Sequence, residues 1–205
     1  SLKDLATEHR ALVTLAYTHF QPAQLTTLGK RIALWAQDLL LDLHELARIR
    51  QSMRFRGAKG ATGTQASFLD LFDGDTQKVK ELDRGVADRM GFSSTFTVTG
   101  QTYTRKIDAQ ILAALGGLAI SAHKATNDLR ILQGVGELEE PFGRHQVGSS
   151  AMPYKRNPMK LERVSSLAKW VLCEAQNPAW IAATQWFERT LDDSANRRIS
   201  IPQAF

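Results

Sequence analysis

Residues 24–54 read QLTTLGKRIALWAQDLLLDLHELARIRQSMR and carry the clearest structural signal in the chain. Their apolar side chains recur at intervals of mostly three and four residues, as they do on one face of an α-helix. The stretch contains no proline, and no glycine follows Gly29. The pattern therefore predicts one helix of about thirty residues, roughly 45 Å long.

Helical patterns also dominate the rest of the chain. A second long pattern covers about residues 101–132, and a third begins after Pro158 and runs to about residue 176. Shorter ones cover residues 2–15, 66–72, 75–90 and 178–187, whereas β-forming residues gather only at 93–99, which we interpret as an extended link. Helices this long exceed the usual three to four turns and suit a bundle that buries its remaining apolar faces against other subunits.

The predicted fold class is therefore all-α, an elongated bundle of long helices, with residues 1–205 as one central helical-bundle domain. The chain begins within a helical pattern and ends at Pro202-Gln203-Ala204-Phe205 without a helix-stop signal. We therefore expect it to be the central portion of a larger protein.

Composition narrows the classes of partner. The chain has no run of about 18 apolar residues and no apolar signal-peptide core, and its single cysteine, Cys173, excludes an internal disulfide and fits a reducing compartment. We therefore expect a cytoplasmic protein without a membrane partner. The net charge is +5, but the basic residues are scattered and form no aromatic-interleaved stripe, so we expect no nucleic-acid partner.

A basic excess marks residues 144–163, where five Lys and Arg face the single acid Glu162. This cluster indicates either a small bound anion or a solvated basic face. It overlaps residues 148–158, GSSAMPYKRNP, in which Pro153 and Pro158 disfavour a helix.

Such a loop can close over an anion and present an oxygen base to it. A serine hydroxyl acts as a base only with help from cations, backbone N–H donors and the exclusion of water. Lys155 supplies a cation and Asn157 a neutral donor, and either Ser149 or Ser150 could be the base on this local pattern. The alternative, a flexible linker, fits the two prolines poorly.

Two further polar segments stand where long helices are expected to begin. Thr18 and His19 precede a proline turn and the first long helix, and a helix N-terminus would favour a neutral imidazole. The alternatives are an exposed loop histidine and a threonine that bonds its own backbone. Gly100 and Gln101 open the second long helix, either as anion ligands or as an ordinary cap.

Residues 185–198 place three arginines and Ser194 around a predicted irregular turn. Arginine forks suit phosphate and carboxylate groups, although Asp192 and Asp193 could instead pair locally in a solvated turn. Residues 57–64, GAKGATGT, lack the ending of a phosphate loop and are interpreted as a glycine-rich connection. The five histidines and Cys173 lack metal-ligand spacing, so neither zinc nor a dinucleotide is expected.

The spacing Gly148-Ser149-x-x-Met152-x-x-Lys155-x-Asn157 resembles the signature of the fumarase/aspartase superfamily. The fuller string SSAMPYKRNPM at 149–159 resembles, more narrowly, the members of that superfamily that cleave succinylated purine ribotides. Three further segments, residues 18–24, 99–106 and 186–194, resemble the same enzymes in the same order.

This resemblance implies a homotetramer around a twenty-helix core, with each active site assembled from three subunits. The implied reaction is β-elimination of fumarate from adenylosuccinate, giving AMP, and from the succinyl-carboxamide ribotide of purine synthesis, without a metal or organic cofactor. It implies Ser149 as general base and His19 as general acid. The implied substrate contacts are Thr18, Gln101, Lys155, Asn157, Arg163, Arg189, Ser194 and Arg198.

Elementary chemistry agrees with these roles. Elimination needs a base for a proton beside a carboxylate and an acid for the departing nitrogen, and Lys155 and Asn157 would stabilise the charge that develops. The superfamily's N-terminal region, with a second histidine, and its C-terminal helical region have no counterpart here, so we expect this chain to be inactive alone. The alternatives are another superfamily lyase, such as argininosuccinate lyase, or a non-catalytic lyase-like structural bundle.

Overall fold

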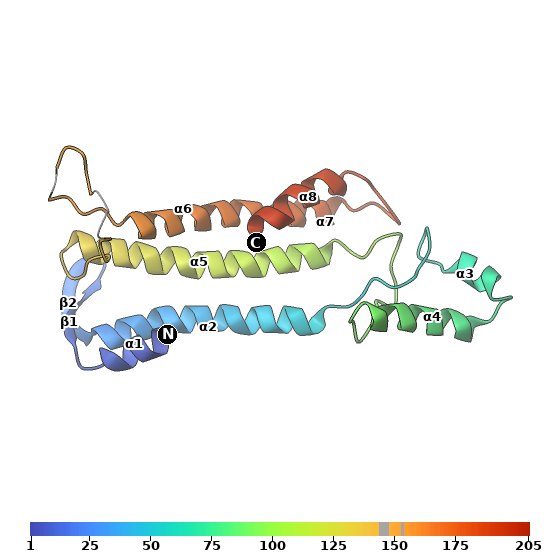
Figure 1. The fold of residues 1–205 in the computed structure, drawn as a ribbon, viewed down its shortest axis with the longest axis horizontal. Helices are drawn as coiled ribbons and strands as arrows, with labels where there is room; N and C mark the ends of the chain where they lie inside the picture. The colour runs from blue at the N-terminus through green and yellow to red at the C-terminus, as the bar shows by residue number, and fades with distance from the viewer. Residues whose placement is uncertain (144–147, 153) are drawn as a thin grey trace. The chain divides into compact units, whose positions relative to one another are not determined.

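The structure, a computed structural model, describes residues 1–143, 148–152 and 154–205 (Figure 1). The chain forms two compact units, which we treat separately. Unit 1 comprises Ser1–Glu45 and Gly117–Trp170, and unit 2 comprises Leu46–Gly116 and Val171–Phe205. The elements in chain order are α1 (Leu2–Glu8), β1 (Val13–Thr18), β2 (Gln21–Thr27), α2 (Leu28–Ser52), α3 (Ala66–Leu71), α4 (Thr76–Arg89), α5 (Lys106–Gly134), α6 (Met159–Glu174), α7 (Asn177–Thr184) and α8 (Asp193–Ala204).

The predicted helical fold is confirmed, since the described chain is mostly helix. The three long periodic stretches become α2, α5 and α6, and the short ones at 66–72 and 75–90 become α3 and α4. The 93–99 window is in no named strand and contributes only an isolated bridge between Phe55 and Thr95. Within the described part of the chain, no helix combines the length and apolar character needed to cross a bilayer.

The structure corrects the prediction at the N-terminus. The helix expected over residues 2–15 ends at Glu8, and Val13–Thr18 pairs with Gln21–Thr27 in an antiparallel hairpin. A β-branched residue stands at each end of the ladder, where Val13 pairs with Thr27 and Thr18 pairs with Gln21. Such residues favour a strand over a helix.

A second correction concerns residues 178–198. The helix predicted over 178–187 ends at Thr184, and the expected irregular turn gives way to α8 from Asp193 onward. Pro178 stands in the first turn of α7, where proline is well tolerated, whereas Pro202 lies inside α8, where proline usually disfavours a helix.

Unit 1 is built on one apolar cluster. Ile32 and Trp35 of α2 pack with Leu132 of α5, and apolar side chains of α1 pack against them. The indole of Trp35 also donates to Asp128 Oδ2 at 2.8 Å, so α2 and α5 are joined by a polar contact next to the core. The β-hairpin belongs to the same unit and directly precedes α2 (Figure 1).

Unit 2 contains a buried ion pair in the glycine-rich connection of residues 57–64. Lys59 Nζ lies 2.7 Å from Asp83 Oδ2 of α4, and both residues are buried. Asp83 also accepts hydrogen bonds from Ala58 N and Thr95 Oγ1. The glycine-rich connection is therefore fastened to α4 through its lysine.

Candidate active site

The tip of the β-hairpin carries the first candidate residues. Thr18 pairs with Gln21, and His19 and Phe20 form the two-residue turn between them, with φ angles of 53° and 59°. Two positive φ angles are typical of a type I′ turn, which usually selects Asn and Gly. For other residues the left-handed region costs about 1–2 kcal/mol each, so the backbone at His19 is strained.

His19 is exposed at this turn, and the prediction that it lies at a helix N-terminus is wrong, because α2 begins only at Leu28. The imidazole instead contributes to a cavity of about 430 Å³ in unit 1. Trp35, Lys124 and Asp128 line the same cavity. Lys124 Nζ lies 3.6 Å from Asp128 Oδ2, so charged groups of both signs line the cavity beside the aromatic ring.

The second candidate group is the loop around Ser149, residues 148–158, which we call the serine loop. Ser149 Oγ accepts hydrogen bonds from the backbone N–H groups of Ala151, at 3.3 Å, and Met152, at 3.2 Å. Two donors aimed at one oxygen favour its negatively charged form. Ser150, by contrast, is exposed, and its hydroxyl has no hydrogen-bond partner among the described residues. The local geometry therefore favours Ser149 over Ser150 as an oxygen base.

The two limbs of this loop are in direct contact. Asn157 Nδ2 donates to the carbonyl oxygen of Gly148 at 3.1 Å, and Lys155 N donates to Met152 O at 3.0 Å. A Cβ atom at Gly148 would lie 2.1 Å from Lys155 O, so this close approach requires glycine. Asn157, expected to face an anion, also holds the loop together.

Glu140, which no sequence pattern indicated, holds the end of the serine loop that leads into α6. Its buried carboxylate accepts hydrogen bonds from the backbone N–H groups of Lys160 and Leu161 at the start of α6. A carboxylate at a helix N-terminus satisfies free N–H groups and complements the helix dipole.

The basic excess predicted for residues 144–163 is partly neutralised. Arg156 Nη1 lies 3.0 Å from Glu139 Oε1, and Arg163 is exposed on α6. Lys155 is also exposed. Pro153 of the predicted loop and residues 144–147 of the basic segment lie outside the described residues.

Unit 2 holds the other predicted residues. Gln101 N donates to Glu188 O at 2.9 Å, and Arg56 Nη1 donates to Gln101 O at 2.5 Å. A Cβ atom at Gly100 would meet Glu188 O at 2.6 Å, so glycine lets the two segments touch. Gln101 does not open a helix as predicted, because α5 begins at Lys106.

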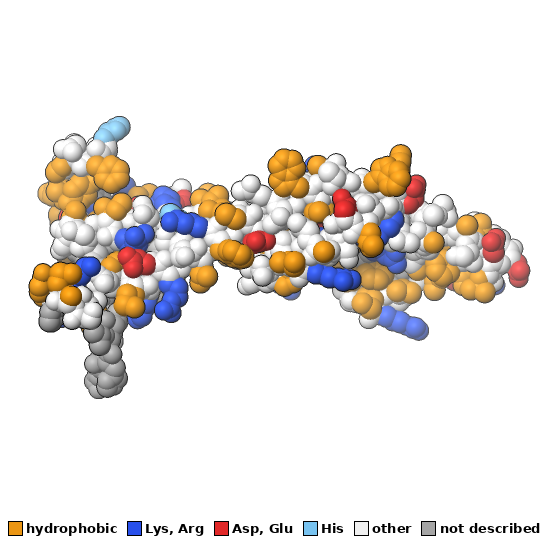
Figure 2. Space-filling view, turned by 90° about the horizontal axis from the view of Figure 1, so that it is seen from above, with side chains coloured by type: hydrophobic (Ala, Val, Ile, Leu, Met, Phe, Trp, Pro, Cys, Tyr) orange, Lys and Arg blue, Asp and Glu red, His pale blue; other side chains and the backbone are white. Residues whose placement is uncertain are grey.

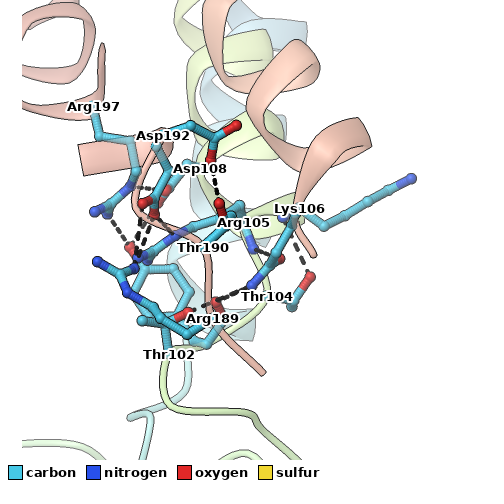
Figure 3. A network of polar contacts seen from close by, with 12 residues as sticks. Thr102, Thr104, Arg105, Lys106, Asp108, Arg189, Thr190, Asp192 and Arg197 are labelled. Carbon is cyan, nitrogen blue, oxygen red and sulfur yellow. Dashed lines mark hydrogen bonds and ion pairs between the residues drawn. The ribbon is translucent and has the colours of Figure 1, made fainter. Parts of the chain in front are cut away.

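A polar network continues from there to the start of α8 (Figure 3). Arg105 Nε lies 2.5 Å from Asp193 Oδ2, and Arg189 Nη1 lies 3.3 Å from both oxygens of the same carboxylate. Gln185 Oε1 accepts the N–H of Arg105 at 2.8 Å. Arg189 therefore pairs locally, as the solvated-turn alternative allowed, but with a buried aspartate.

Tyr103, Asp108 and Arg197 form the neighbouring part of the network. Tyr103 OH donates to Asp108 Oδ1 at 2.7 Å, and Arg197 donates through Nε to Asp108 Oδ2 at 2.5 Å and through Nη2 to Tyr103 OH at 2.6 Å. Burial, with the hydrogen bond to Asp108, raises the pKa of Tyr103. Burial opposes the charge on Arg197, but its bond to Asp108 outweighs this and raises the pKa of Arg197.

Two exposed or half-buried groups remain on α8 beside this network. Arg198 is exposed, and Ser194 is half-buried, with its N–H donated to Leu191 O at 3.1 Å. Unit 1 thus holds two groups of candidate residues, the hairpin tip and the serine loop together with Arg163, and unit 2 holds the others. Among the described residues, no set of three His, Cys, Asp or Glu side chains could hold a metal ion.

The chain is similar in sequence to known lyases. A family model described as "Lyase" matches residues 1–172. The chain is 55% identical to the adenylosuccinate lyase of Saccharomyces cerevisiae and 52% identical to that of Schizosaccharomyces pombe, in each case over 204 residues. These matches cover 100% of this chain and 42% of each relative. The chain therefore spans less than half the length of these relatives.

Solved structures show the same fold at lower identity. A 3-carboxy-cis,cis-muconate lactonizing enzyme from Pseudomonas putida aligns with a TM-score of 0.83 at 23% identity, over 99% of this chain and 44% of that one. A fumarate lyase from Mesorhizobium sp. BNC1 aligns with a TM-score of 0.79 at 22% identity, over 99% of this chain and 43% of the other.

Proposed function

We propose that this chain supplies part of the active site of an adenylosuccinate lyase. The premise is that the chain belongs to the lyase family of the fumarase/aspartase superfamily. The observation that carries the proposal is the 55% identity with the yeast enzyme of that name across the whole chain. The reaction is the elimination of fumarate from adenylosuccinate, which leaves AMP, and from the succinyl-carboxamide ribotide of purine synthesis.

Ser149 is the proposed general base. It would take the proton from the carbon beside a carboxylate of the succinyl group, which places a second negative charge on that carboxylate. The N–H groups of Ala151 and Met152 already donate to its Oγ, which supports an alkoxide there. Lys155 and Asn157 are the loop residues proposed to stabilise the charge of the transition state.

His19 is the proposed general acid, which would protonate the departing nitrogen as its bond to carbon breaks. Its place on a cavity lined by Trp35 and Lys124 supports a substrate-facing role. The remaining proposed contacts to the ribotide and the succinyl carboxylates are Thr18, Gln101, Arg163, Arg189, Ser194 and Arg198. Because Arg189 already pairs with Asp193 through Nη1, it would present its Nε and Nη2 to a phosphate.

The proposed enzyme is a homotetramer with sites shared between subunits. Exposed apolar side chains on the long helices support this assembly, and Figure 2 shows hydrophobic groups on the surface between charged ones. In unit 1 the side chains of Leu40, Leu41, Leu43, Leu167 and Trp170 are each at least 50% exposed. Leaving such a surface in water is unfavourable, whereas burying it against another subunit is favourable. We further propose that the enzyme works in the cytoplasm.

The test is fumarate release from adenylosuccinate by the full-length protein, with wild type beside Ser149→Ala and Ser150→Ala. We expect turnover in wild type and in Ser150→Ala, and a loss of at least about 100-fold in Ser149→Ala. If only Ser150→Ala lost fumarate release, the reaction would stand but Ser150 rather than Ser149 would be the base. If the wild-type protein cleaved only argininosuccinate, that compound would be its substrate instead of adenylosuccinate. A wild-type protein without any lyase activity would contradict the proposal.

A further inference from the structure

We propose that Glu137 is a positioning residue that fastens the hairpin bearing His19 to the end of α5, an inference that rests on the proposed function. Three side chains converge on its carboxylate. Thr14 Oγ1 donates to Oε2, Tyr17 OH donates to Oε1 at 3.3 Å, and Arg31 Nη1 lies 3.6 Å from Oε2. Thr14 and Tyr17 belong to β1, and Arg31 to α2. One carboxylate thus joins three elements of unit 1.

Arg31 makes the fastening two-sided. Its Nη2 donates to the carbonyl oxygen of Leu15 at 2.6 Å, so the guanidinium binds the backbone of β1 while it also pairs with Glu137. The side chains of Arg31 and Glu137 are only 14% and 22% exposed. Partial removal from water strengthens a charge pair relative to one on the open surface.

The end of α5 determines where Glu137 stands. Gly136 has a φ of 78°, and its N–H donates to Gln133 O at 3.1 Å, while Glu137 N donates to Leu132 O at 2.9 Å. These two bonds form a Schellman motif, which ends a helix in one defined geometry and favours glycine at the left-handed position. The carboxylate is therefore carried on a defined helix end beside the buried Leu132.

The hairpin needs such an anchor. An isolated two-stranded hairpin is only marginally stable in water, and its turn residues His19 and Phe20 both hold the unfavourable left-handed conformation. The ladder is also irregular between Leu15 and Tyr17, and a register shift increases local twist. An ideal strand would place Thr14 and Tyr17 on opposite faces, yet both reach Glu137 here.

The consequence for catalysis is geometric. A general acid must lie within hydrogen-bond reach of the atom it protonates, and a misplacement of about 1 Å can cost about 100-fold in rate. Because Tyr17 lies near the end of β1, two residues before His19 in the turn, loss of the anchor would let the tip move. Thr18 is the one proposed substrate contact on the hairpin, so the proposed contacts in unit 2 would be unaffected.

The experiment is a double-mutant cycle in the full-length protein, with fumarate release from adenylosuccinate as the readout. We expect Glu137→Ala to lower kcat by about 10- to 100-fold with KM within about threefold of wild type. In the His19→Ala background the same substitution should have almost no effect, because the group it positions is already absent. Glu81→Ala, which removes an exposed glutamate of α4, is the matched control and should leave kcat unchanged.

Amide hydrogen exchange supplies a readout that does not depend on the assay. In Glu137→Ala the amides of residues 13–27 should exchange faster, while those of α4 keep their wild-type rates. Glu137→Gln, which keeps an oxygen acceptor without the charge, should show a smaller increase. Unchanged exchange in the hairpin would overturn the anchor even if the protein proved to be no adenylosuccinate lyase. An equal loss of kcat from Glu137→Ala with and without His19 would overturn its action through His19.

Discussion

Arg105 and Asp193 are 88 residues apart in the sequence, yet Arg105 Nε lies 2.5 Å from Asp193 Oδ2. Their side chains are only 5% and 3% exposed. The pair joins the residue just before α5 to the first residue of α8, and Arg189 reaches the same carboxylate. The segment that carries the proposed anion-binding arginines is therefore held in place by a buried charge.

Asp193→Asn should destabilise the protein strongly. The substitution leaves Arg105 buried without its countercharge, and breaking one side of a buried pair typically costs about 3–5 kcal/mol. Urea denaturation of the two variants would measure the change in the free energy of unfolding. Asp192→Asn is the matched control, because Asp192 is exposed and its contact is to the nearby Thr190, so we expect a change within about 0.5 kcal/mol. Equal stability of Asp193→Asn and wild type would contradict the role of the pair.

Such long-range pairs explain the limits of prediction from this sequence. Periodicity gave α2, α5 and α6, because a repeat of three and four residues is a local property of the chain. The hairpin was missed because Val13–Thr18 continues an apolar pattern that a short helix would also satisfy. Only the pairing with Gln21–Thr27 decides between a strand and a helix, and that pairing depends on contacts outside the segment itself.

The candidate site divides in the same way. The resemblance pointed to the loop around Ser149 and to the segments of Gln101 and Arg189, because those residues are adjacent in the sequence to the rest of their motifs. It did not point to Glu137 or Glu140, whose partners lie on other elements. Gly136 was the available signal for Glu137, since a glycine just past a helical pattern favours a helix end.

Gly148→Ala should impair catalysis far more than stability. The new Cβ would lie 2.1 Å from the carbonyl oxygen of Lys155, so one limb of the serine loop must move. Since Ser149 is the proposed base, its displacement should lower kcat for the proposed cleavage of adenylosuccinate by at least about 10-fold.

Gly85→Ala is the matched control for that experiment. Gly85 lies inside α4, and a Cβ atom there meets nothing within 4 Å. Alanine is the better helix former, so this variant should gain about 0.5–1 kcal/mol in stability at wild-type kcat. Wild-type kcat in Gly148→Ala would show that the contact between Gly148 and Lys155 does not hold the proposed base, Ser149, in place.

Asp83 should make the stability of the protein depend on acid pH. Burial alone would raise the pKa of Asp83, but hydrogen bonds from Lys59, Ala58 and Thr95 outweigh it and hold the pKa below its ordinary 3.8. A carboxyl group that is more acidic in the folded state stabilises the protein fully above the unfolded pKa. That contribution is lost as the pH falls through the folded pKa, because the unfolded chain takes up the proton first.

Urea denaturation between about pH 7 and pH 3 would test this with Asp83→Asn. At neutral pH the variant leaves the buried Lys59 without its countercharge and should be less stable by about 3 kcal/mol. Below about pH 4 the difference should narrow, because protonated Asp83 and asparagine are both neutral and nearly the same shape. Asp88→Asn, at an exposed position of the same helix, should follow wild type at every pH. The difference in stability between wild type and Asp83→Asn could instead stay constant down to about pH 3. Asp83 would then titrate alike in the folded and unfolded chain. Lys59 would then fasten the glycine-rich connection by shape rather than by charge.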